Sequence, residues 1–172
     1  MLHIHHVNIF NDTAATEIYT RALTRALADA GARVTLYVNP SVRLWDDLTG
    51  ERITVINSKN EQQLLQQIPD QGAVVLTQSA ISPRCVERMA AVHRIAGFAH
   101  MPMFQRSGES LKPYHLLFTV SRYCIDLLRV AGLANIYPEP VYGIADLARS
   151  DEPVVRRSPY MIDRRKFRDV LI

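Results

Sequence analysis

A repeated rhythm along the chain constrains its fold more than any other feature. Short apolar runs rich in β-branched residues alternate with stretches in which apolar residues recur at helical spacing. The runs predict strands at residues 2–10, 33–38, 52–56, 73–77, 94–99 and 115–120, with a last short strand at 136–137. Helices are predicted at residues 17–30, 60–67, 82–92 and 122–131. This alternation indicates an α/β protein with a mostly parallel sheet and helices on both faces.

Residues that start and stop secondary structure support these boundaries. The first helix has an apolar stripe from Ile18 onward, and Gly31 is typical of a helix C-terminus. Ser82 and Pro83 combine a capping residue with a proline at the first helical position. The run AVVLT at 73–77 carries no charge, which predicts a central strand that is buried on both faces.

The size and composition are those of one globular domain. The chain has 172 residues, of which 48% are hydrophobic and 22% charged. No apolar run approaches the ~20 residues that a transmembrane helix needs. The N-terminus lacks the basic segment and apolar core of a secretory signal. We therefore expect a cytoplasmic location and two reduced thiols, Cys85 and Cys124.

Charge is distributed unevenly along the chain. Residues 154–172 hold six basic and two acidic side chains, a net charge of +4, whereas the rest of the chain has a net charge of −1. A basic tail can contact nucleic acid or an anionic membrane surface, or it can be a solvated helix or linker. The basic residues have few aromatic neighbours, so nucleic-acid binding is the weakest of these interpretations and none is predicted.

Parallel sheets bind ligands at the carboxyl ends of their strands, near the point where the strand order reverses. The loops after the first, fourth, fifth and sixth strands are therefore the candidate site. Three histidines, His3, His5 and His6, lie in the first strand, where side chains alternate between the two faces. They cannot converge on one ion without further ligands, so no metal site is predicted; hydrogen bonding under a helix is the expected role of His3 and His5.

The loop after the first strand contains Asn11, Asp12 and Thr13. It has no glycine, which excludes both the GxGxxG dinucleotide loop and the P-loop. Its polar side chains can hydrogen-bond a sugar hydroxyl, or they can merely cap the helix that follows. We therefore treat these three residues as candidate substrate-binding residues.

Two further candidates follow the fifth and sixth strands. His100 can orient a hydroxyl or stabilise developing charge, or it can be an ordinary loop histidine; Met101, Met103 and Phe104 after it suggest an apolar cover. Ser121 is a predicted helix cap. Arg122 beside it can bind a phosphate or carboxylate, or remain solvated.

Motifs of other enzyme classes are missing. The chain has no GxSxG nucleophile motif and no pair of acids at a catalytic spacing. Asp46 and Asp47 follow Trp45 in a loop and are expected at the surface.

Three segments together resemble the N-terminal domain of retaining GT-B glycosyltransferases of family 4. The first is the strand that ends in HxxN, followed by a polar loop, an Ala- and Leu-rich helix and AGARVTLYV. The second, LLFTVSRYCIDLLRVAGLANIYPEPVYGI, is similar to the family's VS…G…IPxGV segment and is the most specific match. The third, SPYMIDRRKFRDVLI, resembles the inter-domain linker.

The resemblance implies a Rossmann-like N-terminal domain at residues 1–150 and a basic inter-domain linker at 151–172. The nucleotide-sugar donor would bind to a carboxy-terminal domain that this sequence does not contain, and no other cofactor is implied. The family position of His100 is near the transferred sugar, and Ser121 matches the VS serine. The implied activity is sugar transfer to a glycan or lipid-linked acceptor in bacterial polysaccharide or lipopolysaccharide assembly. Peripheral contact with the inner membrane is a further implication.

The sequence also departs from the family pattern. Ala14 and Ala15 stand where the family has a glycine pair before its glutamate, and the asparagine of the PNGV motif is missing around Pro140. These departures leave a second interpretation open, a non-catalytic α/β binding or scaffold module that has lost the transferase site. Because transfer needs both domains closed around their substrates, we expect the isolated chain to be inactive.

Overall fold

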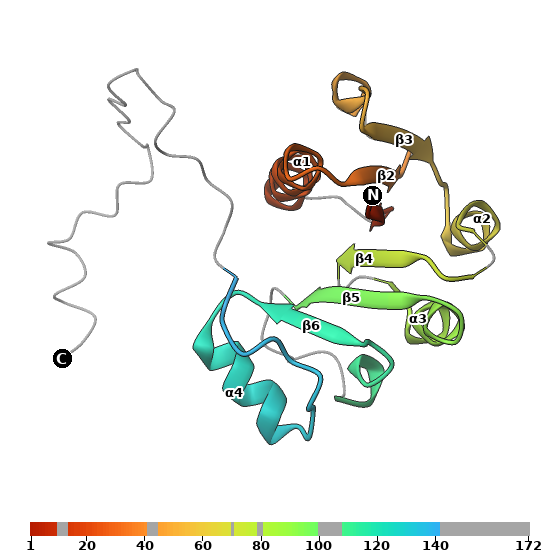
Figure 1. The fold of residues 1–172 in the computed structure, drawn as a ribbon. Helices are drawn as coiled ribbons and strands as arrows, with labels where there is room; N and C mark the ends of the chain where they lie inside the picture. Colours follow the sequence, from red (N-terminus) through yellow and green to blue (C-terminus); the bar gives the residue numbers. More distant parts are fainter. Residues whose placement is uncertain (10–13, 41–44, 70, 79–80, 100–107, 142–172) are drawn as a thin grey trace, which may run out of the picture.

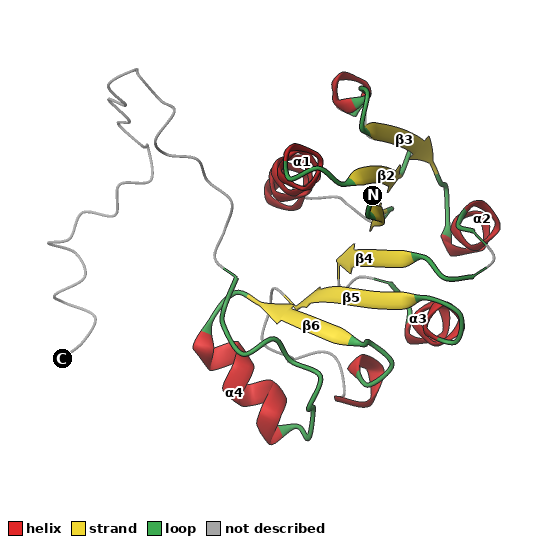
Figure 2. Ribbon diagram, viewed as in Figure 1, coloured by secondary structure: helices red, strands yellow, loops and turns green. Residues whose placement is uncertain are grey.

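The computed structural model describes residues 1–9, 14–40, 45–69, 71–78, 81–99 and 108–141. Its strands form a six-stranded, all-parallel sheet with the order β3-β2-β1-β4-β5-β6 (Figures 1 and 2). The strands are β1 (His3–Asn8), β2 (Arg33–Val38), β3 (Ile53–Asn57), β4 (Val74–Gln78), β5 (Arg94–Ala99) and β6 (Leu116–Thr119). The helices are α1 (Ala14–Asp29), α2 (Glu61–Gln67), α3 (Pro83–Ala90) and α4 (Arg122–Val130), with short 3-10 turns η1 (Asp46–Leu48) and η2 (Gly108–Leu111). The predicted fold class, a Rossmann-like α/β sheet, is confirmed.

The strand order reverses between β1 and β4. Ile4 of β1 pairs with Val34 of β2 on one side and with Val74 of β4 on the other. The chain reaches β4 from the outer strand β3 through α2, and then adds β5 and β6 outward. The uncharged run around β4 therefore occupies the middle of the sheet, as its composition predicts.

Most boundaries agree with the predictions, but the first helix begins earlier than expected. It starts at Ala14, three residues before Glu17. The prediction followed the apolar stripe, and Ala14 and Ala15 favour a helix through backbone propensity without contributing to such a stripe. The predicted strand at 136–137 is only an isolated parallel bridge between Ile136 and Leu117.

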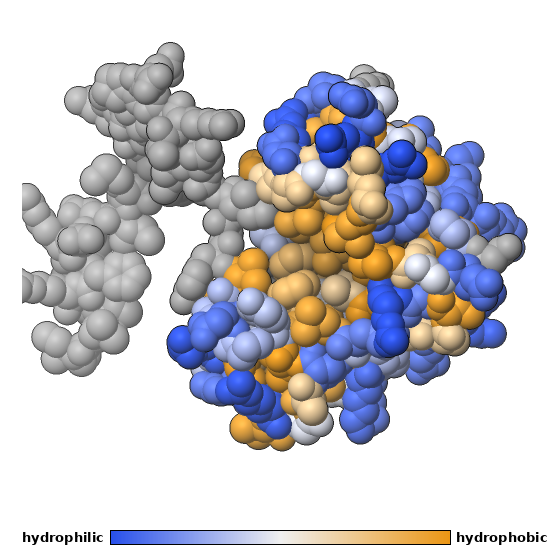
Figure 3. All heavy atoms as spheres, viewed as in Figure 1, coloured by the Kyte–Doolittle hydropathy of each residue, from blue (hydrophilic) through white to orange (hydrophobic). Residues whose placement is uncertain are grey.

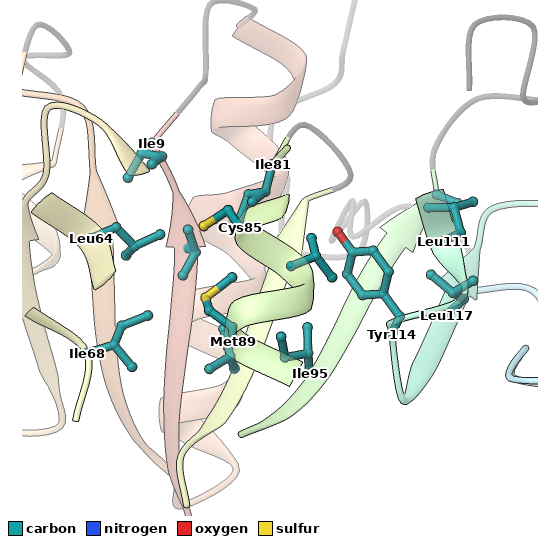
Figure 4. Packing of buried hydrophobic residues seen from close by; sticks show 14 of the residues in the cluster. Ile9, Leu64, Ile68, Ile81, Cys85, Met89, Ile95, Leu111, Tyr114 and Leu117 are labelled. Carbon is teal, nitrogen blue, oxygen red and sulfur yellow. The ribbon is translucent and has the colours of Figure 1, made fainter. Parts of the chain in front are cut away.

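Side-chain alternation along the strands builds two separate cores. One core lies on the α2–α3 face of the sheet, where strand residues such as Val75 and Ile95 pack against Leu64 of α2 and Met89 of α3 (Figure 4). Leu128 of α4 belongs to the same core. The other core lies on the α1 face.

On the α1 face, Ala28 of α1 packs with strand residues such as Leu36 and with Trp45 from the loop after β2. A row of aromatic rings then crosses towards the β6 edge: Tyr19–Phe98, Phe98–Phe118 and Phe118–Tyr137, with centroids 5.1–5.4 Å apart. Figure 3 shows apolar residues gathered on the surface between α1 and α4.

One glycine is required by close packing. A Cβ on Gly97 of β5 would lie 2.5 Å from a ring carbon of Tyr114, which is itself only 3% exposed. The absence of a side chain at Gly97 therefore lets the Tyr114 ring lie flat against β5 in the α2–α3 core.

Among the described helices, none has the length and apolarity required to cross a membrane. The predicted linker at 151–172 lies outside the described residues.

Candidate functional site

The carboxyl edge of the sheet carries buried polar side chains from three strands. Asn8 ends β1, Thr77 lies near the end of β4 and Thr119 ends β6, and each is at most 4% exposed. Asn8 Nδ2 donates to Thr20 Oγ1 of α1 at 2.8 Å, and Thr119 Oγ1 donates to the Ser121 carbonyl at 3.2 Å. These bonds fix the strand ends from which the candidate loops emerge.

Sequence reasoning did not single out Thr77 and Thr119. The available signal was their position: each is a polar residue at the end of an otherwise apolar run. In a parallel sheet such residues all come to one edge, whatever their separation along the chain.

Ser121 caps α4, as predicted. Its Oγ accepts a hydrogen bond from the Cys124 backbone N–H at 3.2 Å, and its carbonyl accepts from Ile125 N–H. This hydroxyl therefore holds the first turn of α4 in place beside the end of β6. Its predicted role in substrate binding stays a prediction.

Arg122 begins α4 and is exposed. Its Nη2 lies 3.1 Å from Glu139 Oε2, and 72% of the arginine side chain and 62% of the glutamate side chain are exposed to solvent. Water screens such a pair, so the guanidinium can exchange this carboxylate for another anion at little cost. Glu139 is a neighbour that the sequence analysis did not predict.

The segment at 135–141 runs alongside β6 and brings Glu139 to this edge. Leu117 N–H donates to the Asn135 carbonyl at 2.7 Å, and Tyr137 N–H donates back to the Leu117 carbonyl at 2.8 Å. Val141 N–H then donates to the Thr119 carbonyl at 2.7 Å. The segment therefore extends the carboxyl edge beyond β6, and PEPV lies beside the start of α4.

The remaining predicted site residues are His100, Asn11, Asp12 and Thr13. They lie outside the described residues, as do Met101, Met103 and Phe104. The described chain ends at Ile9 before the first of these loops and at Ala99 before the second. Their roles stay predictions.

The β1 histidines lie on both faces of the sheet, as the strand geometry predicts. His3 Nε2 is 2.9 Å from Thr35 Oγ1, and His5 Nδ1 is 3.0 Å from Tyr37 Oη. The expectation that these two are hydrogen-bonded is confirmed, and both partners belong to the neighbouring strand β2. His6 is the histidine beneath a helix, with Nδ1 2.9 Å from Thr24 Oγ1 of α1.

Burial keeps these imidazoles neutral at pH 7. Desolvation lowers the pKa of His6 to about 4 and, together with the nearby His3 and His93 charges, lowers the pKa of His5 to about 4. Desolvation and the charge of Arg33 also lower the pKa of His3. Within the described ranges, no three His, Cys, Asp or Glu side chains gather in a way that could hold a metal ion.

The acidic loop after β2 is a surface feature, as expected for Asp47. Arg21 donates a hydrogen bond to the Asp47 carboxylate, which lowers the pKa of that group, and Arg25 Nη2 lies 3.1 Å away. The Arg21 guanidinium also lies over the ring of Trp45, 5.8 Å from its centroid. These contacts anchor the loop to α1 rather than form a reactive group.

The two cysteines are free and buried, as expected of reduced thiols. Burial, with a smaller contribution from the negative charge of Glu61, raises the pKa of Cys85 to about 12. A thiol in this state is a poor nucleophile, which argues against cysteine chemistry at this position.

No protein-family model matches the chain, and no curated protein sequence matches it.

Proposed function

We propose that this chain is the acceptor-side N-terminal domain of a retaining GT-B glycosyltransferase. The enzyme would transfer a sugar from a nucleotide-sugar donor to a glycan or lipid-linked acceptor. A Rossmann-like sheet alone does not distinguish this activity from many others. The observation that carries the proposal is the contact between two parts of the most specific resemblance, the VSRY segment at the start of α4 and the PEPV segment at the β6 edge.

That contact consists of a backbone bond and an ion pair. Val141 N–H donates to the Thr119 carbonyl, and Glu139 holds the guanidinium of Arg122. Both segments adjoin the carboxyl edge of the sheet, which is where such folds bind ligands. Arg122 is exposed there in the first turn of a nine-residue helix, so its side chain is available to an anionic group of a substrate.

The other residues take their roles from position. β5 ends at this edge with Ala99, and we assign to His100, the next residue in the sequence, contact with the reacting hydroxyl or the transferred sugar. β1 borders the switch point of the sheet, and we assign to Asn11, Asp12 and Thr13, which come after β1 in the sequence, hydrogen bonds to acceptor hydroxyls. The nucleotide-sugar would be held by a further domain, and the basic residues at 156–168 would favour an anionic membrane surface.

A second candidate function is that of a binding or scaffold module without catalysis. The observation that favours it is that the two described site residues already have bonding partners within the chain. The Ser121 hydroxyl already accepts from Cys124 N–H, and Arg122 is already paired with Glu139. An α/β module that uses these groups only for its own structure would show the same contacts.

The test is a sugar-transfer assay on two proteins. One is the 172-residue chain, and the other is the chain extended by any coding sequence that continues the frame beyond Ile172. Both are incubated with labelled nucleotide sugars and a bacterial lipid extract. Transfer by the extended protein alone, with kcat reduced at least ~100-fold in His100→Ala, supports the proposal.

Two outcomes contradict it. Substantial transfer by the 172-residue chain would contradict the need for a donor domain. A frame that continues into a donor domain, but yields a protein that transfers no sugar, would favour the binding module. Asn135→Ala is a structural control, since Asn135 Nδ2 donates to the carbonyls of Leu111 and Tyr114 and is not one of the assigned substrate contacts.

A further inference from the structure

A cleft lies between α2 and α3, outside the site described above. It has a volume of about 440 Å³, and residues of both helices line it. The two helices lie side by side on the α2–α3 face of the sheet (Figure 4). The cleft is open to solvent on the outer side of this helix layer, where Gln62, Gln66, Arg84 and Arg88 are exposed.

The end of the cleft beside the starts of α2 and α3 is fixed by a hydrogen-bonded clamp between the two helices. Glu61 at the start of α2 accepts two hydrogen bonds from Ser82, one from the backbone N–H at 2.7 Å and one from the hydroxyl at 2.5 Å. The same hydroxyl accepts from Cys85 N–H and so caps α3. The spacing of α2 and α3 is therefore set before any ligand arrives.

The clamp also leaves the charge of the cleft unbalanced. Glu61 is the one acidic residue among those that the structure places around the cleft, and both of its carboxylate oxygens are occupied by Ser82. Arg84 and Arg88 line the opposite wall, one helical turn apart on α3. Across the described part of the chain, neither guanidinium takes part in an ion pair or side-chain hydrogen bond.

The arginines of this cleft differ from several others in the molecule. Arg21 and Arg25 hold Asp47, Arg122 holds Glu139, and Arg129 lies 3.9 Å from Asp126. Arg84 and Arg88 have no such carboxylate among the ion pairs of the described residues. Two adjacent arginines without one, on the wall of a preformed cleft, form an array of guanidinium donors for an external oxyanion.

We propose that this cleft binds a small ligand bearing an oxyanion, either a carboxylate or a phosphate. Arg84 and Arg88 hold the oxyanion through paired N–H···O bonds. The amides of Gln62 and Gln66 on the facing helix hydrogen-bond the polar part of the ligand, and the partly buried Leu65 contacts its apolar part. The proposal does not depend on the transferase function, because no residue of the cleft belongs to that site.

The experiment is an NMR titration of the full 172-residue chain, in which backbone amides and arginine Nε–H groups are followed. The probes are inorganic phosphate and succinate, each added at constant ionic strength. We expect saturable shifts at the four exposed residues of the cleft with at least one probe. Binding of phosphate alone identifies a phosphate-bearing ligand, binding of succinate alone identifies a carboxylate, and binding of both supports the shared oxyanion chemistry.

Variants separate a built site from general attraction of anions. Arg84→Gln and Arg88→Gln should each weaken binding ~10-fold, and the double variant should abolish the saturable shifts. The double lysine variant keeps the charge but loses the guanidinium fork, and should bind more weakly than the wild type. Arg129→Gln, on α4, is the matched control and should leave binding unchanged.

The proposal is overturned if neither probe gives a saturable shift. It is also overturned if the double glutamine variant binds as tightly as the wild type. Circular dichroism of each variant checks that α2 and α3 are retained, so that a loss of binding is assigned to the arginines and not to unfolding.

Discussion

The two faces of the sheet are covered in different ways. On the α2–α3 face, two helices, η2 and α4 seal a largely aliphatic core around residues such as Leu64, Met89 and Ile95. On the α1 face, one long helix makes polar contacts with β1, through Asn8–Thr20 and His6–Thr24, and aromatic rings continue towards the β6 edge. The first face derives stability from apolar burial, whereas the second combines burial with specific hydrogen bonds that fix a strand end.

The same difference separates the two candidate sites. At the carboxyl edge, the candidate site begins at strand ends held by buried polar groups, which suits a site that must position substrates. The α2–α3 cleft lies on the outside of an aliphatic core and is held open by a Glu61–Ser82 clamp. Arg84 and Arg88 can therefore bind the proposed ligand without a rearrangement of that core.

The largest expected effect is a cavity in the α2–α3 core. Leu64 of α2 is fully buried, so Leu64→Ala should lower the free energy of unfolding by ~2–5 kcal/mol. Urea unfolding monitored by circular dichroism measures this change. Val130→Ala is the control, because Val130 on α4 is 87% exposed and its truncation should cost less than ~0.5 kcal/mol. Similar losses in the two variants would mean that α2 does not close this core.

The next effect tests the histidines on the two faces of β1. The folded pKa values of His5 and His6, about 4, lie below the ~6.5 of an unfolded histidine. Between these values the unfolded chain binds more protons than the folded chain, so stability is retained above pH 6.5 and lost as the pH falls towards 4. We expect each of these two groups to contribute a loss of ~2 kcal/mol between pH 7 and pH 4.5.

The matched variants His5→Gln and His6→Gln keep a hydrogen-bonding side chain and remove the titration. Each should flatten the dependence of unfolding free energy on pH, measured by urea unfolding at several pH values. A His6→Gln slope identical to that of the wild type would show that the α1 face does not carry this pH sensitivity.

Close packing at Gly97 gives a smaller effect on the α2–α3 face. Gly97→Ala places a methyl group against the Tyr114 ring and should cost ~1–3 kcal/mol. Thermal unfolding measures the loss. In a Tyr114→Leu background the same substitution should cost less, because the flat ring is gone; strictly additive losses would argue against this contact.

The sequence predicted this fold well and the site incompletely, for physical reasons. β5 has the predicted bounds, 94–99, because the charged Arg94 opens a compact apolar run that ends at Ala99. The spacing of apolar residues does not show which neighbouring side chain a buried polar group will hydrogen-bond. The sequence analysis therefore did not predict that His3 and His5 bond to side chains of β2. The spacing also does not show long-range ion pairs such as Arg122–Glu139, since the two residues are brought together by the path of 135–141 along β6.

The smallest expected effect concerns the Arg122–Glu139 pair at the carboxyl edge, beside β6. A double-mutant cycle with Arg122→Gln and Glu139→Gln should give a coupling of ~0.2–1 kcal/mol, which falls as salt is raised. Urea unfolding at low and high ionic strength measures it. A coupling well above this range would make the pair a structural element and favour the binding-module interpretation. A weak coupling means that Arg122 can exchange Glu139 for another anion at little cost in free energy. A substrate-binding arginine at the carboxyl edge requires this.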